Sequence, residues 1–129
     1  MKERALPEDV LDLIRNCVPS MDALEILIFF CRHREQAWSI TELIDAIRPT
    51  IVSDGPARDV VAHLVACGIV GETGGRFAYR PRGTTAKACE GLVVAYNERP
   101  VTLIRTLYEI ADSKKIQAFA DAFRLRKDP

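Results

Sequence analysis

Apolar residues recur along most of this chain at helical spacing, and the pattern predicts a mainly α-helical protein. Two helices are expected first: an amphipathic one that begins near Pro7, and a second from Met21 to about Cys31. The second is apolar nearly all round through the run Ile-Leu-Ile-Phe-Phe, which is typical of a helix buried on several sides. We therefore expect it to be the central helix of the core.

Two further helices are predicted between residues 39 and 68. Ser39 to Glu42 reads Ser-Ile-Thr-Glu, a capping box that marks a helix start, and Pro49 should end that helix. Ser53 is expected to cap the next helix. Gly68 should end it, because glycine readily takes the left-handed conformation found after helices.

After Gly68 the pattern changes to that of two short strands, at 69–70 and 77–79. The residues between them include Gly74-Gly75, which suits a tight hairpin turn. Ala37-Trp38 is a candidate for a further short strand. The segment therefore has the order strand, helix, turn, helix and hairpin.

This order resembles the winged helix-turn-helix of bacterial transcription regulators. Ser39 to Leu43 corresponds to the positioning helix, residues 57–70 to the recognition helix and its exit strand, and residues 71–81 to the wing. The resemblance implies a mainly α fold with a winged helix-turn-helix core and a small β-hairpin wing. It also implies a DNA-binding transcription regulator.

The winged-helix core is assigned to residues 21–82, with extra helices in residues 1–20 and 83–129, all within a single domain of residues 1–129. Three amphipathic helices are predicted after the wing, over about 84–96, over 100–108, and from a cap at Ser113 onward. Their apolar stripes can pack back on the first two helices or against a second copy. The layout resembles in outline the multidrug-resistance-type regulators, which dimerise through terminal helices. We therefore expect a homodimer through the C-terminal and N-terminal helices.

Basic residues in and after the predicted wing are the main candidates for contact with double-stranded DNA. Residues 76–87 contain four of them and no acid. Wing arginines commonly hold phosphates or enter the minor groove, although the same charges could simply protect an edge strand from aggregation. On the predicted recognition helix, Arg58 could read guanine or hold a phosphate, with His63 nearby. The predicted DNA-binding residues are Arg58, His63, Arg76, Arg80, Arg82 and Lys87.

Acidic residues on the predicted recognition helix give a second hypothesis. Asp59 lies in the middle of its expected outer face and Asp54 at its start, and both oppose a polyanion. The net charge of the chain is zero. The alternative is a winged-helix protein–protein interaction module that does not bind DNA.

Four cysteines, at positions 17, 31, 67 and 89, fall among apolar residues and form no CxxC pair. We expect them to be buried free thiols, with zinc ligation together with a histidine, or redox sensing, as alternatives. Neither histidine belongs to a recognisable nucleophilic or metal motif. The sequence therefore predicts no enzyme, no cofactor and no metal site.

The distribution of apolar residues also bears on location. No apolar run approaches the roughly 20 residues that span a bilayer, and the first residues lack the apolar core of a signal peptide. We therefore expect a cytoplasmic protein without membrane contact.

Overall fold

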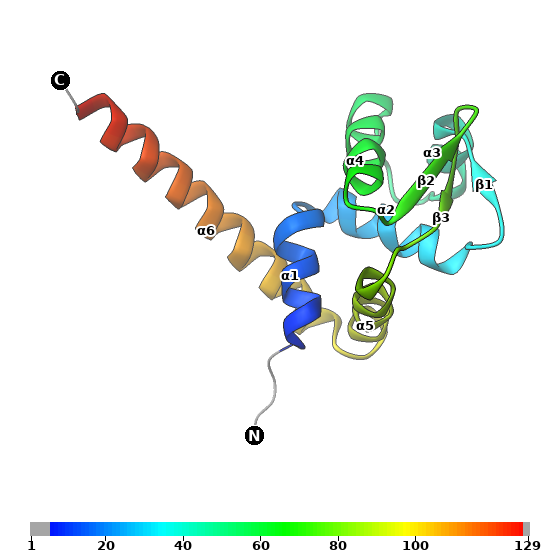
Figure 1. The fold of residues 1–129 in the computed structure, drawn as a ribbon, viewed down its shortest axis with the longest axis horizontal. Helices are drawn as coiled ribbons and strands as arrows, with labels where there is room; N and C mark the ends of the chain where they lie inside the picture. The colour runs from blue at the N-terminus through cyan, green and yellow to red at the C-terminus, as the bar shows by residue number, and fades with distance from the viewer. Residues whose placement is uncertain (1–5, 128–129) are drawn as a thin grey trace.

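Helices make up most of the computed structural model, which describes residues 6–127, with side chains as far as residue 122. Over this range a small antiparallel sheet of three strands accompanies the helices (Figure 1). The prediction of a mainly α protein is thus confirmed. The elements are α1 (Glu8–Cys17), α2 (Met21–Arg32), β1 (Ala37–Trp38), α3 (Ile40–Ala46), α4 (Asp54–Ala66), β2 (Val70–Thr73), β3 (Arg76–Tyr79), α5 (Thr84–Glu98) and α6 (Pro100–Lys127).

Helix α2 lies at the centre of the core, as its apolar run predicts. Leu27 and Phe30 are fully buried, and α4, α5 and β3 all pack against the helix. Ser20 caps its start by accepting a hydrogen bond from the backbone N–H of Ala23. Burial on several sides explains why so few polar side chains occur along this helix.

The two helices that follow begin and end where their local signals place them. The Ser39 hydroxyl accepts from the N–H of Glu42, and the Glu42 carboxylate accepts from the N–H of Ser39, so the capping box is complete. Ser53 is the residue before α4, although its side chain makes no capping hydrogen bond. Gly68 has a φ of 79°, the left-handed conformation expected after a helix.

The hairpin is joined by a two-residue turn. Val70 pairs with Tyr79 and Thr73 with Arg76, which leaves Gly74 and Gly75 as the loop, both at positive φ. Glycine at both positions suits a type I′ turn, whose twist matches that of the strands. Strand β1 adds to the other side of β3, giving the order β1-β3-β2.

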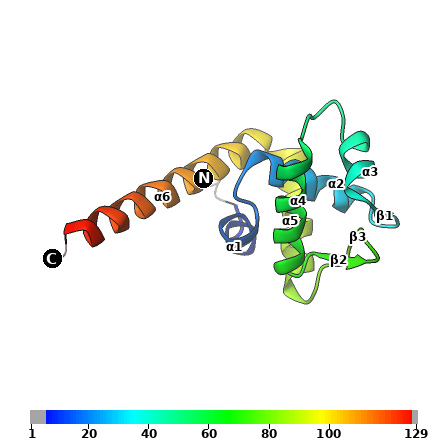
Figure 2. The same ribbon diagram turned by 90° about the horizontal axis from the view of Figure 1, so that it is seen from above.

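The prediction of separate helices after Pro100 is wrong, because α6 runs unbroken for 28 residues. Pro100 starts it, but no proline or glycine follows before Lys127. Ser113 is exposed within the helix, where a serine lowers helix stability only slightly. Its preference for capping positions is not enough to interrupt the helix. Figures 1 and 2 show the C-terminal part of α6 projecting away from the other elements.

Helix α1 lies against α5 and the first part of α6. A Cβ at Gly91 of α5 would come within 2.8 Å of Val10 Cγ2 in α1, so glycine is what allows this approach. On α6, Leu103 and Leu107 are buried against the body. Among the described helices, none is both long and apolar enough to cross a membrane.

Candidate nucleic-acid interface

The outer face of α4 is formed mainly by small side chains. Ala57, Val61 and Leu64 are buried toward α2 and α3, as their spacing predicts. The opposite face, with Gly55, Asp59, Ala62 and Ala66, is exposed. Small residues leave room for a close approach to another molecule, but the exposed Asp59 carboxylate places a negative charge on the same face.

Arg58 lies beside this face and is already paired within α4. Its Nε donates to Asp54 Oδ2 at 2.6 Å, and both side chains are more than half exposed. The hydrogen bond and charge of Asp54 raise the pKa of Arg58. A guanidinium has five N–H donors, so donors remain for a further partner, but its charge is largely balanced.

His63 is attached to the end of α1 rather than directed away from the protein. Its Nε2 lies 2.9 Å from the backbone oxygen of Asn16. Since a carbonyl oxygen can only accept, Nε2 must hold the proton in this geometry. A groove contact through Nε2 would therefore require this bond to break.

Arg76 joins the hairpin to α3. It donates to the backbone oxygen of Ala37 at 3.1 Å and to Glu42 Oε1 at 2.6 Å. The Glu42 carboxylate thus accepts from both Arg76 and the Ser39 backbone. The Ser39 hydrogen bond first, and then Arg76, lower the pKa of Glu42. Arg76 is exposed, but its positive charge is already paired with the Glu42 carboxylate of the same chain.

Arg80 and Arg82 lie just beyond the hairpin and, unlike Arg76, pair with no acid in the described part of the chain. Their backbone N–H groups donate to Ile69 and Gly68, at 2.8 and 3.1 Å, which fixes the strand exit against the end of α4. Both side chains are exposed, and among the described residues no ion pair or side-chain hydrogen bond joins either one. They are therefore two available cations on a rigid backbone.

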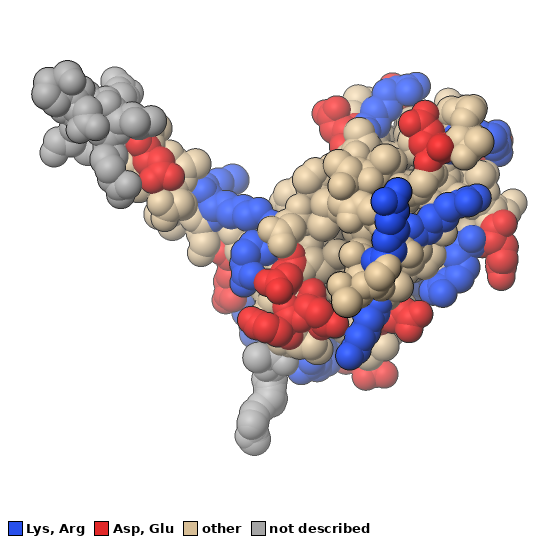
Figure 3. Space-filling model, in the orientation of Figure 1, with Lys and Arg blue, Asp and Glu red and all other residues tan. Residues whose placement is uncertain are grey.

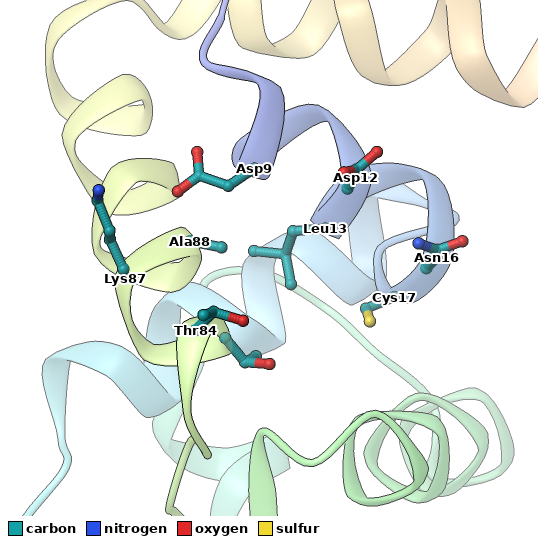
Figure 4. Close-up of a pocket in the computed structure, with 9 residues that line it drawn as sticks. Asp9, Asp12, Leu13, Asn16, Cys17, Thr84, Lys87 and Ala88 are labelled. Carbon is teal, nitrogen blue, oxygen red and sulfur yellow. The ribbon is translucent and has the colours of Figure 1, made fainter.

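Lys87 lies farther along, on α5. It lines a hollow of about 380 Å³ together with Asp9 and Asp12 of α1 (Figure 4). Of the predicted DNA-binding residues, the structure thus brings Arg80 and Arg82 together beside the end of α4. Lys87 lies beside the acidic residues of α1, and His63 is hydrogen-bonded to the end of that helix.

Sequence reasoning missed Arg34, which follows α2. Its guanidinium lies 5.0 Å from the centre of the Tyr79 ring on β3, and its Nε donates to the Cys31 carbonyl. Stacking holds this cation beside the strand that leads to Arg80. No local signal indicates this, since the contact depends on how β3 packs against α2. Figure 3 shows basic side chains gathered over the middle of the face that presents the hairpin, with acidic ones around its margins.

Comparison of the chain with protein-family models, with curated proteins and with solved structures finds no match. The function must therefore be argued from the geometry of the site itself.

Proposed function

We propose that this protein is a cytoplasmic, winged-helix DNA-binding transcription regulator. The support is the order of elements: α3, a turn, α4, and a hairpin whose second strand, β3, pairs with β1. In this proposal α4 is the recognition helix and the β2–β3 hairpin is the wing. The observation on which it chiefly depends is the pair Arg80 and Arg82, which are exposed, have no acidic partner among the described residues and are held by backbone hydrogen bonds to the residues just after α4.

The same geometry favours contact with phosphates over extensive base readout. Arg58 is balanced by Asp54, and Asp59 is exposed on the face that would enter the major groove. Arginines held by a rigid backbone position a protein on the duplex without reading its sequence. We therefore assign Arg80 and Arg82 to the DNA backbone or minor groove, with a smaller role for Arg58.

The exposed face of α6 supports a homodimer. At 100° per residue, Val101, Tyr108 and Phe119 fall within about 20° of one another around the helix axis. Their exposed fractions are 66%, 55% and 74%, whereas Leu103 and Leu107 on the opposite side are buried in the protomer. A helix with apolar stripes on two sides needs a second partner surface. We propose that a second copy of α6 provides it, while α1 uses its apolar side within the protomer.

A protein-interaction module is the second candidate function. Ile51, in the connection between α3 and α4, is 85% exposed and lies close in sequence to the exposed Asp54. Together with Asp59, this makes an apolar and acidic surface that suits a basic protein better than DNA. In that case Arg80 and Arg82 only keep the hairpin soluble.

Fluorescence anisotropy on labelled duplex DNA distinguishes the two functions. The duplexes are the region upstream of the protein's own gene and a scrambled sequence, each at about 50 and 200 mM salt, the range over which phosphate contacts change affinity most clearly. We expect tighter binding to the upstream duplex and a steep loss with salt. Absence of binding at the lower salt would contradict the regulator and favour the interaction module.

The double variant Arg80→Ala/Arg82→Ala should bind every duplex about tenfold more weakly, because exposed ion pairs contribute up to about 1 kcal/mol each. The slope of log affinity against log salt should also fall by about two, one for each lost phosphate contact. The matched control is Arg15→Ala/Arg105→Ala, which removes two charges from α1 and α6 and should change affinity much less. Equal losses in the two double variants would contradict the assignment to the wing.

Glu42→Gln tests whether Arg76 is held back from DNA by its ion pair. Glutamine retains an oxygen for the Ser39 N–H but removes the charge that binds Arg76. Affinity for DNA should rise by up to about fivefold, the range expected for one exposed ion pair. Glu72→Gln removes the same charge from β2, where no ion pair of the described residues joins Glu72 to Arg76. A smaller gain in DNA affinity for Glu72→Gln than for Glu42→Gln would show that the gain comes from releasing Arg76. Equal gains in the two variants would contradict this explanation.

A further inference from the structure

The four cysteines meet in two pairs that their spacing does not suggest. Cys31 of α2 lies close enough to Cys89 of α5 for the two thiols to affect each other's pKa, and the same holds for Cys17 at the end of α1 and Cys67 just after α4. All four are free thiols. In the second pair, Cys67 Sγ lies beside the backbone of Asn16, the residue that precedes Cys17.

Only one pair is accessible from solvent. Cys31 and Cys89 are 4% and 0% exposed and lie in the core. Cys67 is half-buried, and Cys17, although 8% exposed, lines the hollow between α1 and α5 (Figure 4). The expectation of four buried thiols is therefore wrong for Cys67. A reagent in solution can reach the Cys17–Cys67 pair without unfolding the core.

Polar groups at the end of α1 surround this pair. Cys67 Sγ lies 3.7 Å from the Asn16 carbonyl oxygen and 3.9 Å from His63 Nε2. The Nε2–H of His63 donates to this same carbonyl, so an imidazole proton donor lies close to the sulfur. Lys114 of α6 donates to the neighbouring carbonyl of Arg15. Two proton donors, one of them cationic, thus lie beside the thiols.

We propose that Cys17 and Cys67 form a redox-sensitive pair that hydroperoxides convert into an intramolecular disulfide. In the first step the Cys67 sulfur attacks the peroxide, the O–O bond breaks, and the products are the Cys67 sulfenic acid and an alcohol or water. In the second step the Cys17 sulfur displaces the hydroxyl from Cys67 and water leaves. Two thiols and one hydroperoxide thus give one disulfide, one alcohol and one water.

The environment of each thiol assigns the two roles. Burial, and then the neighbouring Cys67 thiol, raise the pKa of Cys17 to about 12, so Cys17 remains a protonated thiol at neutral pH. Cys67 is the more exposed of the two and adjoins His63. Cys67 is therefore the thiol that meets the oxidant, and Cys17 is the one that resolves the sulfenic acid.

The disulfide would join two parts of the fold that pack mainly on other elements. Helix α1 packs on α5 and α6, whereas α4 packs on α2 and α3. Cys17 is the last residue of α1, and Cys67 directly follows α4. Oxidation would therefore connect the α4 end of the protein covalently to the side from which α6 extends. This inference does not depend on DNA binding, and its test needs no DNA.

The test is peptide mapping of the full-length, reduced protein after treatment with hydrogen peroxide. Remaining thiols are alkylated in denaturant before digestion with trypsin. Peptide 16–32 contains both Cys17 and Cys31, so its partner identifies the bridge: 59–76 contains Cys67, and 88–105 contains Cys89. We expect peptide 16–32 linked to 59–76 through Cys17, two of the four thiols lost, and a protein that remains a single chain on a non-reducing gel.

Variants separate the pair from the core cysteines. Cys67→Ser and Cys17→Ser should each abolish the bridge, and Cys31→Ala should retain it, with circular dichroism as the check on folding. Cys17→Ser should accumulate sulfenic acid at Cys67, detected with a dimedone probe. A bridge to peptide 88–105, a bridge only between chains, or four unreacted thiols in the wild-type protein would each overturn the proposal. The wild-type result decides even if a variant fails to fold.

Discussion

Replacing Phe30 with alanine should lower the free energy of unfolding by about 3–5 kcal/mol, the range for a buried aromatic ring. Phe30 is fully buried in α2, and its ring meets that of Phe29 edge-on at 6.1 Å between centroids. Truncation removes the apolar area of the ring and leaves a cavity where α4, α5 and β3 converge on α2. Equilibrium unfolding in urea, followed by circular dichroism, measures the loss.

A loss of this size is a large part of the roughly 5–15 kcal/mol that stabilises a domain. The control is Val94→Ala on α5, where the side chain is 51% exposed. It should change the free energy of unfolding by less than about 0.5 kcal/mol. A Phe30→Ala protein as stable as Val94→Ala would contradict the placement of α2 at the centre of the core.

The elements that the sequence predicts well are those specified by neighbouring residues. The capping box at Ser39 and Glu42, the left-handed Gly68 and the Gly74-Gly75 turn are each complete within a few residues. The apolar run of α2 likewise predicts its own burial. Local chemistry fixes these features almost independently of the rest of the chain.

The candidate site was less predictable, because its electrostatics depend on contacts between distant segments. Arg76 meets Glu42, His63 meets Asn16, and Arg34 stacks on Tyr79. Each contact changes what a basic residue is available to do. Net charge and spacing cannot separate a paired arginine from an unpaired one, and so Arg76 and Arg80 look equivalent in the sequence.

The cysteine pairs and the length of α6 could not be predicted from the sequence pattern, for two further physical reasons. Thiols that meet through helix packing have no required sequence spacing, unlike ligands on one turn. On α6, the apolar positions at Leu103, Leu107, Ile116 and Phe119 fit both short helices and one long helix with two stripes. The distinction depends on which side of the helix the protomer covers. That side is set by the packing of α1 on the first part of α6.

The double variant Ile116→Ser/Phe119→Ser should raise the dissociation constant of the homodimer by at least about a hundredfold. The two side chains are 69% and 74% exposed on the projecting part of α6, so each presents a large apolar area that a second copy would cover. Burying an aliphatic or aromatic side chain contributes about 1.5–3 kcal/mol, and a symmetric dimer loses both side chains twice. Even about 3 kcal/mol of this total is more than a hundredfold in affinity. Sedimentation equilibrium over a range of protein concentrations measures the change.

The effect should be confined to assembly, because neither side chain contributes to the buried core of the protomer. Circular dichroism of the double variant should therefore show a folded, helical protein. Ala118→Ser is the matched control, since residue 118 lies about 100° around the helix from Phe119 and is also exposed. It should leave the dimer intact. If the wild-type protein sediments as a monomer at every concentration, α6 does not pair with itself and the proposed homodimer is contradicted.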